Sequence, residues 1–201
     1  MPEQKITKIL YDYKLEEFVK RLEELQNPSV YYVSDLIYCP WKRYFRLRFP
    51  YLTFTFEPLA VMGELVHRGL QGILVEKGFQ PEYEVSRTIR VNNEEVIIKG
   101  RIDAYKPGEL VEIKTSRGYT DSLPYPHHLL QVKLYMELTN VEKATLIYVS
   151  SDKIIEYDVK LDEPVLEKLL QETMNLSVAP RWDWECRSCV FYKICPHRIN
   201  K

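Results

Sequence analysis

Hydrophobic residues recur at helical spacing in three parts of the chain. Spacings of three and four residues predict helices over residues 14–26, 58–77 and from about 162 onward, and a further helix is expected over 126–139, after Pro124 and Pro126. The expected buried stripes are Leu15, Phe18, Val19, Leu22 and Leu25 in the first helix, Met62, Leu65, Val66, Leu70 and Ile73 in the second, and Leu166, Leu169, Leu170 and Met174 in the last. Pro58 and Pro164 stand where helices begin, and Asn27-Pro28 ends the first.

Segments of alternating or continuous β-branched and aromatic residues predict strands between these helices. They are expected over residues 83–91, 95–105, 109–115, 144–150 and 154–159. Asn92-Asn93 suits a tight hairpin because asparagine tolerates positive φ, and Lys106-Pro107-Gly108 and Asp152-Lys153 suit turns. The order of helices, meander, helix, hairpin and helix predicts an α/β layered domain.

Composition limits the classes of function. The 201 residues are 45% hydrophobic, enough for one domain, and the formal net charge is -1, so any nucleic-acid-binding surface must be local. No apolar run approaches the ~20 residues of a membrane span, and the amino-terminal segment lacks a signal-peptide core. We therefore expect a cytoplasmic protein without membrane contact, in which the four cysteines are metal ligands or thiols rather than disulfides.

The segment 100–114, GRIDAYKPGELVEIK, places two carboxylates and an ammonium on neighbouring strands. The turn at residues 106–108 brings Asp103 beside Glu112, and strand alternation directs Glu112 and Lys114 to the same face. Two acids held so close favour a divalent cation between them, and oxygen ligands suit Mg²⁺ or Mn²⁺. The alternative is that these charges form cross-strand pairs on the solvent-exposed face of a sheet whose other face is buried.

Three further groups of residues are ambiguous when taken alone. The basic-aromatic segment 41–49, with Lys42, Arg43, Arg46 and Arg48, suits either a single-strand-binding groove or a solvated helix face, and Ser34-Asp35 is a candidate helix cap before it. His67 lies beside the apolar stripe of its helix, where a core histidine is the common case. Gln131 and Tyr135 share one helix face, whereas His127 and His128 are expected at the surface.

The cysteines flank the strands. Cys186, Cys189 and Cys195 have the spacing C-x2-C-x5-C, and Cys39 is the only other cysteine. Four thiolates suit zinc or an iron–sulfur cluster, and unligated thiols remain an alternative. A cluster that included Cys39 would staple the two ends of the chain. By analogy with a disulfide that closes a loop of about 147 residues, it would stabilise the fold by roughly 5 kcal/mol.

The order of these motifs resembles a known nuclease family. A histidine in a helix, then G-R-I-D, E-I-K nine residues beyond the aspartate, and Q-x-x-x-Y in a helix, with one cysteine before and three after, is similar to the CRISPR-associated RecB-like exonucleases, the Cas-four family of the iron–sulfur PD-(D/E)xK nucleases. The resemblance covers residues 31–196, with Ile102 in place of the literal proline. It implies a restriction-endonuclease-like core, a central mixed sheet flanked by helices, whose terminal segments are joined by a metal cluster.

The resemblance also implies roles for individual residues. His67, Asp103, Glu112 and the carbonyl of Ile113 would hold Mn²⁺ or Mg²⁺, Lys114 would be the catalytic lysine, and Gln131 and Tyr135 would support the site. The cysteines at positions 39, 186, 189 and 195 would bind an iron–sulfur cluster, 4Fe-4S rather than 2Fe-2S. The single domain would divide into an N-terminal helical segment (1–57), a nuclease core (58–160) and a C-terminal helix with the cysteine segment (161–201).

The implied activity is metal-dependent hydrolysis of DNA. The family implies a 5'-to-3' exonuclease on single-stranded DNA that processes ends for CRISPR spacer acquisition, in contact with the CRISPR integrase complex. The chemistry agrees, because phosphodiester hydrolysis needs a metal and a fixed cation. The alternative is a non-catalytic module that binds DNA ends for an integration complex.

Overall fold

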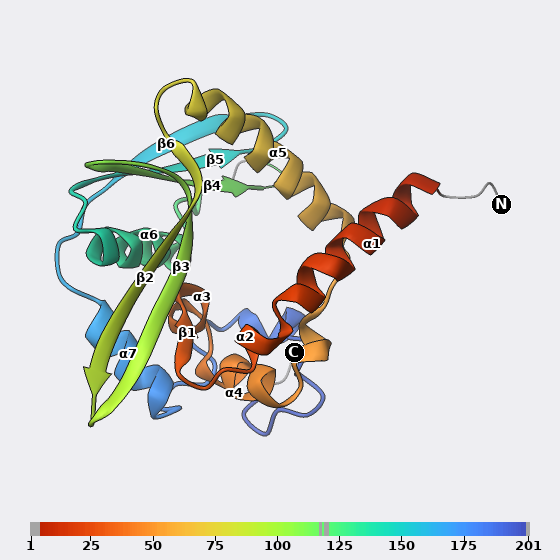
Figure 1. The fold of residues 1–201 in the computed structure, drawn as a ribbon, viewed down its shortest axis with the longest axis vertical. Helices are drawn as coiled ribbons and strands as arrows, with labels where there is room; N and C mark the ends of the chain where they lie inside the picture. The colour runs from red at the N-terminus through yellow and green to blue at the C-terminus, as the bar shows by residue number, and fades with distance from the viewer. Residues whose placement is uncertain (1–4, 117, 119–120, 200–201) are drawn as a thin grey trace.

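A six-stranded mixed sheet forms the centre of the molecule (Figure 1). The structure is a computed structural model that describes residues 5–116, 118 and 121–199. The strands are β1 (Val30–Tyr32), β2 (Gln80–Val91), β3 (Glu94–Lys106), β4 (Glu109–Thr115), β5 (Lys143–Val149) and β6 (Ile154–Val159). Pairs β1–β3 and β4–β5 are parallel and pairs β2–β3, β3–β4 and β5–β6 antiparallel, which confirms the predicted mixed sheet.

The sheet forks along one edge of β3. Strand β2 pairs with the whole of the other edge, from Gln80↔Tyr105 to Val91↔Glu94. On the forked edge β1 pairs with residues 97–99, and β4 pairs only with residues 104–106. Residues 100–103 therefore have no strand partner on that edge. We call this gap between β1 and β4 the fork. It lies inside the segment 100–114, which carries Asp103 and Glu112.

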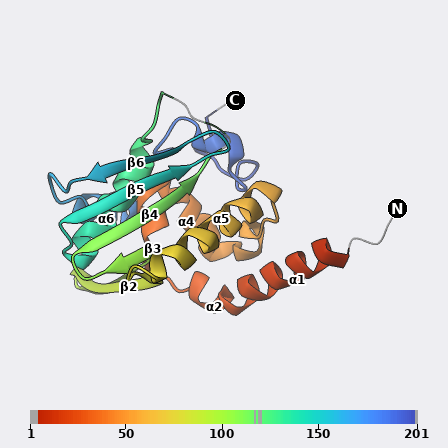
Figure 2. The same ribbon diagram turned by 90° about the horizontal axis from the view of Figure 1, so that it is seen from above.

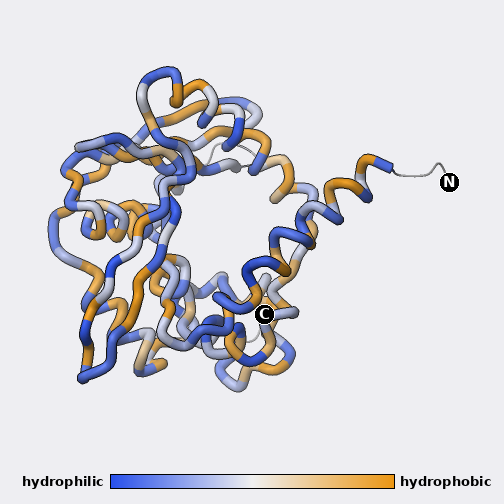
Figure 3. Tube along the Cα trace, viewed as in Figure 1, coloured by the Kyte–Doolittle hydropathy of each residue, from blue (hydrophilic) through white to orange (hydrophobic). Residues whose placement is uncertain are grey.

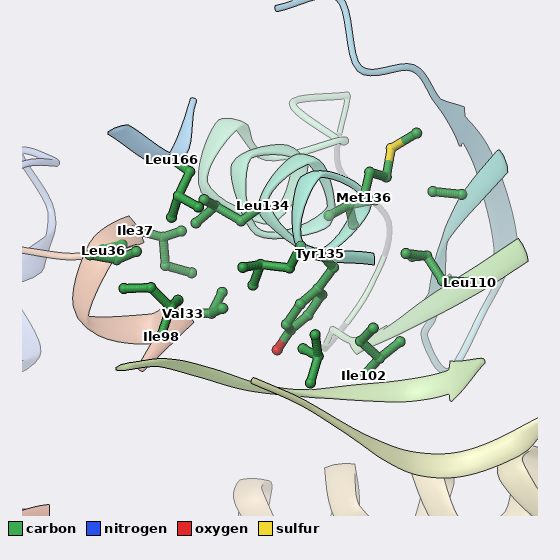
Figure 4. Packing of buried hydrophobic residues seen from close by; sticks show 14 of the residues in the cluster. Val33, Leu36, Ile37, Ile98, Ile102, Leu110, Leu134, Tyr135, Met136 and Leu166 are labelled. Atoms are coloured by element: carbon green, nitrogen blue, oxygen red, sulfur yellow. The ribbon is translucent and has the colours of Figure 1, made fainter. Parts of the chain in front are cut away.

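Helices cover the sheet on both faces (Figures 1 and 2). They are α1 (Lys5–Lys20), α2 (Leu22–Leu25), α3 (Val33–Ile37), α4 (Pro40–Arg48), η1 (Pro50–Thr53), α5 (Pro58–Val75), α6 (Pro126–Thr139), α7 (Leu166–Met174) and η2 (Glu185–Ser188). The larger hydrophobic core joins α3, α6 and α7 to one face of the sheet (Figure 4). A smaller core on β3, β4 and β5 is covered by Leu70 and Leu74 of α5.

The buried face predicted for α5 is only partly correct. Met62, Leu65 and Ile73 are 63%, 63% and 60% exposed, whereas Gln71 is only 5% exposed. The helix rests on the sheet through an adjacent face, where Leu70, which was predicted to be buried, and Leu74 meet the smaller core. Because α5 is apolar around much of its circumference, its hydrophobic residues do not define a single inward direction (Figure 3).

The first helix also differs from its prediction. It begins at Lys5 rather than at residue 14, and α2 follows it as a separate turn. Val19, expected inside, is 54% exposed. The helix is held by ring contacts of Tyr11 and Phe18 with Phe54 rather than by either core. Within the described part of the chain, no helix has both the length and the hydrophobicity needed to cross a lipid bilayer.

Candidate functional site

The β3–β4 hairpin brings Asp103 and Glu112 to the fork, as predicted. Gly108 has φ +85°, a conformation that glycine adopts without strain, and the ladder runs from Lys106↔Glu109 to Ala104↔Val111. Beyond that pair, the backbone N–H of Ile113 donates to Asp103 Oδ2 at 2.7 Å. A side chain thus replaces the strand as hydrogen-bond acceptor at the point where β3 and β4 separate.

Glu112 is a buried carboxylate with one unused oxygen. Its side chain is 3% exposed, and Oε1 lies 2.7 Å from Lys114 Nζ. Oε2 is buried and has no hydrogen-bond partner among the described residues. Burial raises the pKa of Glu112 above its usual range, against the opposing effect of Lys114. The alternative of a solvent-exposed sheet face is therefore wrong for Glu112, because its side chain is buried.

Lys114 connects the strand to helix α6. Besides its ion pair with Glu112, its ammonium donates to Gln131 Oε1 at 2.9 Å. Burial lowers the pKa of Lys114, but Glu112 raises it further, and the net shift is upward. The lysine is therefore a fixed positive charge at neutral pH.

Tyr135 closes the unpaired edge of β3. Its hydroxyl donates to the carbonyl of Arg101 at 2.9 Å and accepts from Gln131 Nε2 at 3.3 Å. Figure 4 shows the ring pointing from α6 toward β3. A Cβ at Gly100 would stand 2.5 Å from Tyr135 Cε1 and 2.9 Å from Val33 Cγ2, so only glycine lets the ring approach. The Gln131–Tyr135 pair braces the fork and holds Lys114.

His67 reaches the site from α5. Its Nδ1 lies 3.2 Å from Asp103 Oδ1. Burial lowers the pKa of His67, but the Asp103 carboxylate raises it further, so the imidazole has a pKa above its usual value. One turn later, Gln71 Nε2 donates to the carbonyl of Asp103 at 2.9 Å. Gln71 was not among the predicted site residues, although it is a polar residue four positions after His67 and hence on the same helical face.

The side chains at the fork are of types that bind divalent cations, but in the structure they are paired with one another. No three His, Cys, Asp or Glu side chains in the described residues form a group that could hold a metal ion. Asp103 faces His67, and Glu112 faces Lys114. The buried, unpartnered Glu112 Oε2 is nevertheless the kind of atom that a cation satisfies.

The four cysteines gather around one cavity. Cys39, Cys186, Cys189 and Cys195 all line it, and none forms a disulfide. They do not form a metal-binding group among the described residues. Burial raises the pKa of Cys39 to about 11, so without a metal this thiol is protonated. The donor set, four thiols on one cavity, fits a cluster that binds thiolates.

The two ends of the chain are joined by contacts that use no sulfur atom. Glu185, 1% exposed, accepts from the backbone N–H of Cys39 at 2.9 Å and lies 2.9 Å from Lys42 Nζ. The same carboxylate accepts from the N–H groups of Arg181 at 3.1 Å and Trp182 at 3.0 Å. We call these four contacts the Glu185 clasp. No sequence signal predicted it, because Glu185 is simply the residue before Cys186.

Two basic residues of the basic-aromatic segment do not line the groove that one interpretation expected. The segment forms α4 and the residue after it, and Arg43 and Arg46 are 9% and 7% exposed. Arg46 donates to Asp35 Oδ2 at 2.7 Å, and Arg43 donates to the carbonyl of Val30 at 3.2 Å. Asp35 is the third residue of α3 and accepts from the N–H of Tyr32. Arg46 thus joins α4 to α3 and Arg43 joins α4 to β1, and the alternative of a solvated face is also wrong for these two residues.

His127 and His128 are not ordinary surface residues. His128 Nδ1 lies 2.8 Å from the hydroxyl of Tyr148, and burial lowers the pKa of His128 to about 2. The His127 ring contacts Trp184 at a centroid distance of 4.9 Å. Both histidines therefore link the start of α6 to its neighbours.

Comparison with known proteins identifies the family. The curated CRISPR-associated exonuclease Cas4 of Saccharolobus solfataricus is 35% identical over 97% of this chain and 100% of its own length. The crystal structure of SSO0001 matches with a TM-score of 0.89 and 33% identity, over 97% of this chain and 98% of that one. An alkaline exonuclease of Laribacter hongkongensis, LHK-Exo, shares the fold with a TM-score of 0.55 and 13% identity, over 81% and 90% of the two chains.

No family model matches the chain. The identity and coverage of the curated relative nevertheless carry the assignment, and the mixed sheet flanked by helices agrees with the solved structures. The chain belongs to the CRISPR-associated exonuclease Cas4 family.

Proposed function

We infer that the protein is a metal-dependent DNA nuclease that degrades single-stranded DNA from the 5' end and trims DNA ends for CRISPR spacer acquisition. The observation that carries this proposal is the buried Glu112 carboxylate at the fork of the sheet, in which Oε1 pairs with Lys114 and Oε2 has no partner among the described residues. The exonuclease name of the curated relative supports the reaction class. The trimmed ends would pass to the CRISPR integrase complex.

The proposed metal ligands are His67, Asp103, Glu112 and the carbonyl of Ile113. Mn²⁺ or Mg²⁺ bound there would supply Lewis acidity toward a phosphoryl oxygen and lower the pKa of an attacking water. The imidazole favours Mn²⁺ because nitrogen ligands suit transition metals better than they suit Mg²⁺. Asp103 has Oδ2 fixed by the N–H of Ile113, so its orientation is set before a ligand arrives.

The chain itself supplies charge and orientation. The ammonium of Lys114, held by Glu112 and Gln131, would stabilise the negative charge that develops on the phosphate. Gln131 and Tyr135 would act through the lysine and the β3 edge, as positioning residues. Burial of these groups strengthens their electrostatic effect on the reacting phosphate.

We also propose an iron–sulfur cluster, 4Fe-4S, on the four cysteines of the shared cavity. Its role would be structural, because the cavity is lined by Lys42 and Glu185 of the Glu185 clasp and by none of the proposed catalytic residues. Thiolate ligation would require the thiol of Cys39 to lose its proton on cluster binding, which makes assembly depend on pH.

The test is degradation of single strands labelled at either end. The full-length chain, purified anaerobically, should shorten 5'-accessible strands with Mn²⁺ or Mg²⁺ and stop with a chelator, whereas a blocked 5' end should protect the strand. Digestion from the 3' end would contradict the polarity. DNA binding without cleavage at any metal concentration would favour the non-catalytic end-binding module. Absorption near ~400 nm tests the cluster, and a colourless zinc protein would exclude it.

A further inference from the structure

Three aromatic rings from distant parts of the chain meet beside the start of α6. Tyr38 ends α3, His127 lies in the first turn of α6, and Trp184 precedes η2. The His127 ring stands 4.9 Å from Trp184 and 6.0 Å from Tyr38, and Tyr38 and Trp184 are 6.2 Å apart in an edge-on arrangement. We call these three residues the ring platform.

The platform lies one helical turn from the proposed catalytic centre. His127, Gln131 and Tyr135 recur every four residues on one face of α6, and Gln131 contacts Lys114. Four residues of helix span about 6 Å, a step comparable to one nucleotide of an extended strand. A strand with its phosphate at Lys114 would therefore carry a neighbouring base to the platform.

The platform is less buried than the aromatic residues of the core. Trp184 is 39% exposed, whereas Tyr135, Tyr148 and Phe191 are 4%, 3% and 3% exposed. Tyr38 and His127 are partly exposed. The C-terminal segment does not need the Trp184 ring for its attachment. Trp182 donates to the carbonyl of Ile37, and the Glu185 clasp holds the segment to α4.

The chemistry of the platform suits a base rather than a phosphate. Lys42 Nζ lies 5.0 Å from the Tyr38 ring centroid but is already paired with Glu185, and Asp183 beside Trp184 is exposed. Burial and the positive charge of Lys114 lower the pKa of His127, so its imidazole is neutral at physiological pH. Flat, uncharged rings bind bases of any sequence by stacking.

We propose that Tyr38, His127 and Trp184 form a stacking subsite for a nucleobase of single-stranded DNA, next to the nucleotide held at Lys114. The inference rests on the proposed nuclease function for its ligand. It replaces the segment 41–49 as the place where aromatic side chains meet the strand, because Arg43 and Arg46 of that segment hold the fold together.

The experiment compares Trp184→Leu with Trp184→Phe in the full-length chain. Leucine keeps an apolar side chain without a π face, and phenylalanine keeps a ring. Binding of a fluorescent oligothymidylate is measured by anisotropy in EDTA, so that cleavage does not interfere. Tyr51→Ala, at an aromatic residue of η1 that is 71% exposed, is the matched control.

We expect Trp184→Leu to bind about 5- to 100-fold more weakly, the loss that one stacked base represents, and Trp184→Phe to recover most of the affinity. One abasic position in the oligonucleotide should weaken wild-type binding by the same factor and leave Trp184→Leu unaffected. Equal affinity of the two variants, or additive effects of abasic site and mutation, would overturn the subsite. A wild-type chain that binds strands but never cleaves them would refute the nuclease proposal alone, and one that binds no strand would refute both.

Discussion

Replacing Glu185 tests whether the chain ends are joined without a metal. Glu185→Ala removes the acceptor of three backbone N–H groups and the partner of Lys42. Each unsatisfied buried donor costs about 1–3 kcal/mol, and loss of one member of a buried ion pair costs about 3–5 kcal/mol. Water relieves part of this cost, since the Lys42 side chain is 32% exposed. We expect a destabilisation of about 4 kcal/mol.

The assay is thermal unfolding of the metal-free, reduced protein. For a chain of this size, about 4 kcal/mol corresponds to a melting temperature lower by roughly 8–16 °C. Cys39→Ser is the control, because serine can still accept a hydrogen bond and should cost only about 1 kcal/mol without metal. Glu185→Gln should fall between the two, since its amide retains one acceptor oxygen.

The melting temperature of metal-free Cys39→Ser decides between the Glu185 clasp and the cysteines. If metal-free Cys39→Ser melts as low as Glu185→Ala, the ends are held through the cysteines, and the clasp is incidental. If the clasp account is right, Cys39→Ser instead loses visible absorption while it keeps most of its metal-free stability. This outcome would also show that the roughly 5 kcal/mol expected from a cluster staple overstates its effect, because the unbound ends are already together.

Three further predictions follow from packing and charge. Gly100→Ala should destabilise the fold by about 1–3 kcal/mol in urea unfolding, because its Cβ would overlap Tyr135, and Tyr135→Leu in the same chain should recover part of the loss. Arg46→Ala should cost about 3–5 kcal/mol while exposed Arg48→Ala costs under about 0.5 kcal/mol; equal, small effects would contradict a structural role for α4. His128 is neutral when folded, with its pKa lowered to about 2, so unfolding takes up a proton below about pH 6.5. Stability should therefore fall as pH falls, by at most about 1.4 kcal/mol per pH unit from this group, and His128→Asn should flatten the profile measured by melting temperature.

Five of the six strands, and the turns between them, followed closely from the sequence, whereas β1 was not predicted. The predicted bounds of β4, α6 and β6 agree with the structure, and Asn92 and Asn93 have positive φ as the hairpin requires. These elements were predictable because period-two alternation, proline starts and turn residues are local signals. The association of Asp103 with Glu112 followed from the same turn.

Features that depend on long-range packing were not predictable. The inward face of α5 was ambiguous because apolar residues lie on most sides of the helix. Gln71 is buried because its amide donates to the carbonyl of Asp103, a contact between residues far apart in the sequence. Arg43 and Arg46 have the composition of a nucleic-acid surface, yet their partners on other segments make them structural. The Glu185 clasp joins residues 146 positions apart, and no local pattern specifies such a contact.

The catalytic role of Glu112 is tested by measuring single-strand degradation by Glu112→Gln. The amide has nearly the same shape but cannot supply the buried anionic oxygen, so we expect cleavage to fall at least ~10²-fold with Mn²⁺ while the melting temperature stays near that of the wild type. Glu109→Gln, three residues earlier on β4 and paired with Lys106, is the matched control and should cleave normally. Undiminished cleavage by folded Glu112→Gln would contradict a catalytic centre at the fork of the sheet.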